Sequence, residues 1–103
     1  MYHQIKNFLF VHQGLRFETL GQTSFFNTIV IENDIVIISS TGGEYRINET
    51  LFSQVQDRYE YLAAERPELV HVTTEFGDNW NECPNNRSCP YIAAIIRDFK
   101  VFF

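Results

Sequence analysis

The chain has 103 residues, of which 45% are hydrophobic, 16% aromatic and 20% charged, with a net charge of −5. This composition excludes a disordered chain and predicts one globular domain over residues 1–103, because a chain of this length supports about one modest core. The sequence contains no run of basic residues, so it argues against duplex DNA as a direct ligand, whose binding depends on neutralising phosphates.

The negative charge is concentrated in the later middle of the chain. Between Asp57 and Glu82 there are seven acidic and two basic residues, whereas the rest of the chain carries six of each. Such clusters are common on solvated surfaces. The alternative interpretation is a carboxylate-rich face that mimics nucleic acid and occupies a basic groove on a partner.

Membrane and secretion signals are not found in the sequence. The longest apolar run, residues 29–38, is interrupted by Asn33 and Asp34 and is shorter than the roughly 18 to 20 residues that span a bilayer. The first residues lack the basic start, apolar stretch and cleavage site of a signal peptide. We therefore expect a cytoplasmic protein that does not bind a membrane.

The first half of the chain predicts an antiparallel meander sheet. Residues 2–11 fit both helical and strand periodicity, so the type of this first element stays open. Strands are then expected over four segments separated by turns, the second turn being Asn33-Asp34; the segments are residues 15–19, 28–31, 35–38 and 44–47. The central strands are apolar on both faces, which predicts a cover on each side of the sheet.

Two helices are expected in the second half of the chain. Asn48 is a typical N-cap, and apolar residues recur at spacings of three and four over residues 49–64. The second helix begins at Cys89-Pro90 and is apolar nearly all round, so it should be buried. Residues 69–76 favour one more short strand. The predicted fold class is α+β, an antiparallel meander sheet of about four or five strands packed with two helices.

No strong catalytic or metal-binding motif is present, so we predict no enzyme activity, no metal and no cofactor. Cys83 and Cys89 lie further apart than the two to four residues typical of zinc fingers, and two reduced cysteines beside a loop are favoured. A Cys89 nucleophile with His71 as its base is a weaker hypothesis. So is a divalent-metal nuclease, which would use the acid-x-Lys pattern of Asp98 and Lys100.

Several strand, turn and helix segments carry a family resemblance: Thr19-Leu20, Phe25 or Phe26, residues 29–31 and 35–37, Ser39–Gly42, Arg46-Ile47 and residues 89–95. In this order they resemble small α+β modules of bacterial and phage proteins associated with restriction systems. The resemblance covers about the last four-fifths of the chain and implies a setting in nucleic-acid transactions or phage defence. It transfers no catalytic residue.

The preferred functional hypothesis is a small non-enzymatic cytoplasmic interaction module that binds a protein partner through an aromatic and acidic surface. Aromatic and arginine residues often anchor such interfaces. The expected contact residues are Trp80, Arg87 and Tyr45, with Glu75, Asp78 and Glu82 as an acidic rim. Trp80 has a structural alternative, in which it covers the core.

The alternative hypothesis is a nucleic-acid or nucleotide-binding module. Arg16, Tyr45 and Arg46 would stack on and hydrogen-bond a single strand or a nucleotide. The two arginines can instead pair with Glu18 and Glu44 on the surface of the sheet. The sequence leaves the oligomeric state open.

Overall fold

The first half of the chain folds into a four-stranded antiparallel sheet. The computed structural model describes residues 1–102, in which β1 (Leu15–Glu18), β2 (Phe25–Ile31), β3 (Asp34–Ser39) and β4 (Glu44–Ile47) pair in chain order. Each strand is antiparallel to the one before it. The predicted meander is confirmed, with four strands.

The hairpin between β2 and β3 turns one residue earlier than the sequence predicts. Ile31 pairs with Asp34, so Asp34 belongs to the ladder and the turn consists of Glu32 and Asn33. Glu32 adopts a φ of +57°, a positive value of the kind that two-residue turns between twisted strands require. The predicted turn at Asn33-Asp34 is therefore shifted by one residue.

Three helices accompany the sheet: α1 (Tyr2–Val11), α2 (Glu49–Glu65) and α3 (Cys89–Phe102). The sequence predicts the last two and leaves the first segment open; its buried residues recur at helical spacings and it forms α1. Asn48 caps α2, because its Oδ1 accepts a hydrogen bond from the Leu51 amide at 2.8 Å. The α+β class is confirmed.

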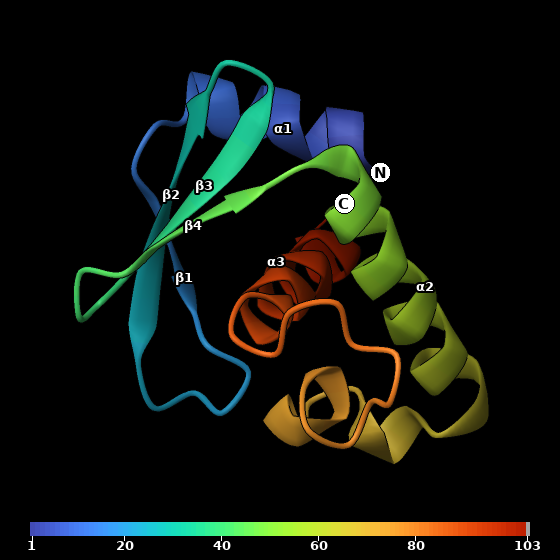
Figure 1. Cartoon of the computed structure of the whole chain (residues 1–103). Coiled ribbons are helices and arrows are strands. Elements are labelled where there is room, and N and C mark those ends of the chain that lie inside the picture. Colours follow the sequence, from blue (N-terminus) through green and yellow to red (C-terminus); the bar gives the residue numbers. More distant parts are fainter. Residues whose placement is uncertain (103) are drawn as a thin grey trace.

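The sheet, α3 and α2 form successive layers, and α1 packs on the same side of the sheet as the other helices (Figure 1). Aromatic side chains join the sheet to α3. The Phe17 and Phe26 rings stack with centroids 5.6 Å apart, and Phe99 and Tyr91 of α3 approach them at 6.3 and 5.0 Å, respectively. On its far side α3 packs against α2, so α3 is the buried helix that its apolar sequence predicts.

The prediction of an additional strand over residues 69–76 is wrong. Residues 67–76 instead form two short 3₁₀ helices, Pro67–Leu69 and Thr73–Phe76, joined by a turn. Strand geometry would place Val70 and Val72 on the same face, but Val70 is 8% exposed and Val72 is 37% exposed. Local backbone hydrogen bonds such as that from the Val72 amide to the Leu69 carbonyl take the place of a ladder.

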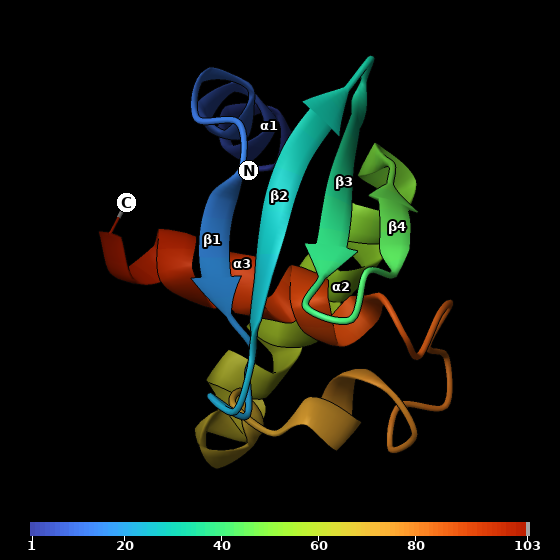
Figure 2. The ribbon, with the colours of Figure 1, turned by 90° about the vertical axis from the view of Figure 1, so that its left-hand side faces the viewer.

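Only one face of the sheet is covered by helices within residues 1–102. Figure 2 shows the sheet from the other side, with its strands in front and the three helices behind. We call this second side the outer face. The sequence predicts a cover on both sides, because its central strands are apolar on both faces, and within this part of the chain the outer face has none.

Candidate functional site

The loop before α3, residues 77–88, carries most of the sequence-predicted contact residues. Its backbone is shaped by consecutive turns, in which the Trp80 amide donates to the Gly77 carbonyl and the Cys83 amide donates to the Trp80 carbonyl, both at 3.0 Å. The Asn85 Oδ1 accepts from the Arg87 and Ser88 amides at 3.0 and 3.2 Å. These local bonds give the loop a defined shape.

A shallow hollow of about 620 Å³ lies in this loop. Its walls are mostly polar, and Trp80 contributes the aromatic surface. The side chains of Asp78 and Asn86 are joined by a hydrogen bond of 3.3 Å. The lining residues are Gly77, Asp78, Trp80, Asn81, Cys83, Pro84, Asn85, Asn86 and Arg87. We call this the loop hollow.

Arg87 stands between the loop hollow and a second one. The second hollow, of about 320 Å³, lies between the β1–β2 connection and the start of α3 and is lined by hydroxyl-bearing residues such as Thr19, Thr23 and Ser24. Asn86 and Arg87 line both hollows. Because Arg87 is exposed, its guanidinium is accessible at this junction.

Trp80 is held in place by an arginine that the sequence interpretation missed. The Arg58 guanidinium lies 5.8 Å from the centre of the Trp80 ring and 5.7 Å from that of Tyr61. It also forms an ion pair of 3.1 Å with Glu75, in which both side chains are about five-sixths buried. The only signal for Arg58 in the sequence is that it is one of two bases within the acidic segment.

Only some of the residues predicted for the acidic rim lie at the loop, and the predicted tyrosine, Tyr45, does not. Asp78 lines the loop hollow and Glu82 is exposed on the same loop, but Glu75 points inward to Arg58. Tyr45 lies on β4, where its ring stacks on Tyr91 with centroids 5.6 Å apart. The structure brings Trp80, Arg87 and Asp78 together and leaves Tyr45 outside this group.

The three residues of the nucleic-acid hypothesis do not line one site. Tyr45 packs against the core on the helix side of the sheet, whereas Arg16 and Arg46 lie on the outer face. Arg46 pairs with Asp34 at 3.3 Å, and the Arg16 guanidinium lies 5.3 Å from the centre of the Phe25 ring. Neither arginine uses the glutamate partner expected from the sequence.

The residues weighed for catalysis are engaged in packing and ion pairs. Burial beside the Cys83 thiol raises the pKa of Cys89 to about 12, so this thiol is protonated at neutral pH and is not an activated nucleophile. Asp98 accepts a hydrogen bond from Arg97 at 2.8 Å, and Lys100 pairs with Glu60. Side chains two residues apart on a helix do not share a face, so Asp98 and Lys100 do not converge.

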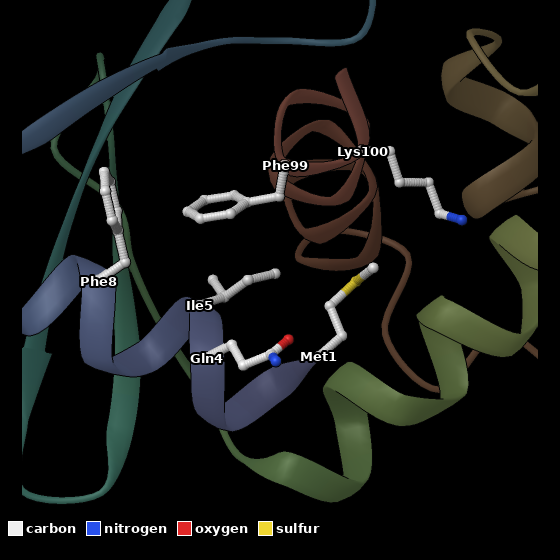
Figure 3. Close-up of a pocket in the computed structure, with 6 residues that line it drawn as sticks. All are labelled: Met1, Gln4, Ile5, Phe8, Phe99 and Lys100. Carbon is white, nitrogen blue, oxygen red and sulfur yellow. The ribbon is translucent and has the colours of Figure 1, made fainter. Parts of the chain in front are cut away.

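An apolar groove lies between α1 and the end of α3, and none of the six contact residues predicted for the protein partner line it. Its volume is about 530 Å³. Figure 3 shows Ile5 and Phe8 of α1 facing Phe99 of α3, while Lys100 extends toward α2. The Phe8 and Phe99 rings meet edge to face at 5.3 Å, which makes the groove part of the helix packing.

Comparison with known proteins assigns no family to this chain. No family model, curated protein or solved structure matches it. Among residues 1–102, no three potential metal-ligating side chains of His, Cys, Asp or Glu are grouped. In the same part of the chain, none of the helices has the length and apolar character that crossing a bilayer demands.

Proposed function

We propose that this protein is a small non-enzymatic cytoplasmic interaction module that binds a protein partner through the loop hollow and its rim. The observation that carries the proposal is the convergence of Trp80, Arg87 and Asp78 on one concave surface. Tryptophan and arginine are the residues most enriched among the dominant contacts of protein interfaces. The family resemblance adds the proposal that this interaction takes place in phage defence or nucleic-acid transactions.

The chemistry of the loop favours a particular kind of contact on the partner. Arg87 offers a planar, forked set of donors that suits a carboxylate, and the structure gives its side chain no ion pair within residues 1–102. Asp78 lines the same hollow as Arg87, and Glu82 is exposed on the same loop. We therefore expect the partner to present a carboxylate to Arg87 and basic side chains to the two acids, with an apolar group against Trp80.

Affinity capture from the native host, with variants of the bait, tests this proposal. The wild-type protein is expected to retain a stoichiometric partner that Arg87→Ala loses. Arg66→Ala is the matched control, because Arg66 is also an exposed arginine but pairs with Glu68 just beyond the end of α2. Absence of a stoichiometric partner, or a partner that Arg87→Ala retains as well as the control does, would contradict the proposal.

The purified partner allows a direct measurement, because Trp80 is the only tryptophan in the chain. Titration with a tryptophan-free segment of the partner should shift the emission of Trp80. Arg87→Ala should weaken the binding by about tenfold or more, which corresponds to about 1.4 kcal/mol. An unchanged spectrum at saturation would place the partner elsewhere on the surface.

A further inference from the structure

We propose that the outer face of the sheet binds a second copy of this chain and forms a symmetric dimer by sheet-on-sheet packing. The face is defined by the residues that point away from the helices. They are Arg16 and Glu18 of β1; Phe25, Asn27, Ile29 and Ile31 of β2; Asp34, Val36 and Ile38 of β3; and Glu44 and Arg46 of β4. This surface is separate from the loop hollow, so the two proposals stand independently.

The outer face has the apolar content of a packed sheet surface. Phe25 and Ile31 are 48% and 42% exposed, and Ile29 and Ile38 are half-buried. Val36 lies in the middle of this face but is only 1% exposed, so the accessible apolar surface comes from its neighbours. An antiparallel sheet that faces water usually carries polar residues on that side. Here the outer face of the two central strands carries Ile29, Ile31, Val36 and Ile38 beside the polar Asn27 and Asp34.

The charges on this face are complementary to those on a second copy. Antiparallel pairing aligns four residues in one row across the sheet, with Arg16 at one edge and Glu44 at the other, and Asn27 and Ile38 between them. In the proposed dimer, the two-fold axis that relates the two copies runs roughly along the strands, above the boundary between β2 and β3. It places Arg16 opposite Glu44 of the second copy and Glu44 opposite Arg16 of the second copy.

The same axis matches apolar residues in the middle of the interface. Ile29 and Val36 are cross-strand neighbours on β2 and β3, so the axis would place the half-buried Ile29 of each copy over the position of Val36 in the other, and the two Ile29 side chains would lie side by side. Two sheets packed in this way lie about 10 Å apart with strands about 30° from parallel, which allows these side chains to interdigitate. Apolar contact at the centre and opposite charges at the edges are typical of a stable interface.

The charge balance favours a second copy over nucleic acid on this face. Two arginines are accompanied by three acids, Glu18, Asp34 and Glu44, and Arg46 is already paired with Asp34. A polyanion needs a cationic surface, which this face does not provide. A surface that carries arginine at one edge and glutamate at the other is complementary to itself under a two-fold rotation.

Charge reversal at the two edges tests the proposed pairing. Sedimentation equilibrium of the wild-type protein over a concentration series should show a species of twice the 12.1 kDa chain mass. Arg16→Glu and Glu44→Arg should each raise the dimer dissociation constant by about tenfold or more, because each places like charges at both ends of the interface. An equimolar mixture of the two variants should dimerise again, since both edge pairs are then of opposite charge.

Arg66→Glu is the control, because Arg66 is an exposed arginine that follows the last residue of α2 and lies away from the outer face. This variant should leave the dissociation constant unchanged. Both tested residues are exposed, and circular dichroism of each variant checks that it is folded. The double variant Arg16→Glu, Glu44→Arg restores opposite charges within one chain and should dimerise as the wild type does.

Three results would overturn the proposal. The first is a wild-type protein that stays monomeric at all concentrations. The second is a dimer that is unaffected by Arg16→Glu, or two weakened variants that do not pair when mixed. The third is a monomer that binds short single-stranded oligonucleotides and loses that binding in Arg16→Glu, which would assign the outer face to nucleic acid.

Discussion

Arg58 is the residue on which the arrangement of the candidate site depends most directly. Its guanidinium pairs with the Glu75 carboxylate and donates to the Glu75 carbonyl at 3.0 Å, while lying over the Trp80 ring. These contacts join α2 to the loop that carries the hollow. One side chain thus links the stability of the domain to the position of the single tryptophan.

Replacement of Arg58 by alanine should destabilise the protein and disturb Trp80. The Glu75 carboxylate would remain mostly buried with the hydrogen bond from Asn79 but without its charged partner, and such a loss costs about 1 to 3 kcal/mol. Urea denaturation measures the change in the free energy of unfolding, and Trp80 emission of the folded variant should also shift. Arg66→Ala is expected to change stability by less than about 0.5 kcal/mol, because exposed ion pairs contribute little. Equal effects of the two variants would contradict this account.

At the scale of secondary-structure elements, the boundary between β4 and α2 is set by Asn48. Its backbone is extended and its side chain accepts from the third residue of the helix, the Leu51 amide. Asn48→Ala should lower the free energy of unfolding by about 1 kcal/mol through loss of this cap. Asn48→Asp keeps an acceptor and should stay within about 0.5 kcal/mol of the wild type. Thermal or chemical denaturation of the three proteins decides between these outcomes.

The elements that the sequence predicts well are those determined by local signals. The cap at Asn48 and the helical spacing after it identify α2, and alternation with tight turns identifies the strands. The prediction of a strand over residues 69–76 was wrong because it rested on β-branched composition alone. The segment instead buries Val70 and Phe76 as two separate anchors with local turns between them.

The candidate site was only partly predictable because its members are far apart in the sequence. Trp80 and Arg87 lie in the same loop, and composition singles them out. The contact between Trp80 and Arg58 depends on the packing of the loop against α2, which no local pattern encodes. Likewise, side chains alternate between the two faces of a strand, so the sequence predicts that Tyr45 and Arg46 of β4 lie on opposite faces of the sheet. Which of these faces is the outer one depends on where the helices pack.

At the scale of the whole molecule, the layers formed by residues 1–102 leave one sheet face without a helix, and the helices on the other side bury ionisable groups. Burial raises the pKa values of Cys89, Tyr59 and Tyr91, and burial together with Asp34 and Glu49 raises that of Tyr2. These groups stay protonated in the folded protein at pH values where they ionise in the unfolded chain. Alkaline conditions should therefore favour unfolding.

The dependence of stability on pH follows from these raised pKa values. The pKa of a cysteine in an unfolded chain is about 8.5, whereas the pKa of Cys89 in the folded protein is raised to about 12. The contribution of Cys89 is thus fully present below about pH 8.5 and falls as the pH rises toward 12, by at most about 1.4 kcal/mol per pH unit. The tyrosines add to the decline above about pH 10, where unfolded tyrosine ionises.

Urea denaturation under reducing conditions at pH 7, about 9 and about 10.5 measures this decline. Cys89→Ala is expected to start from a lower stability, because it removes a buried side chain, but to lose less of that stability as the pH rises. Cys83→Ala is the matched control and should keep most of the wild-type slope. A wild-type free energy of unfolding that is constant across this range would contradict the prediction. It would show that the Cys89 thiol ionises as readily in the folded protein as in the unfolded chain, despite its burial at the start of α3.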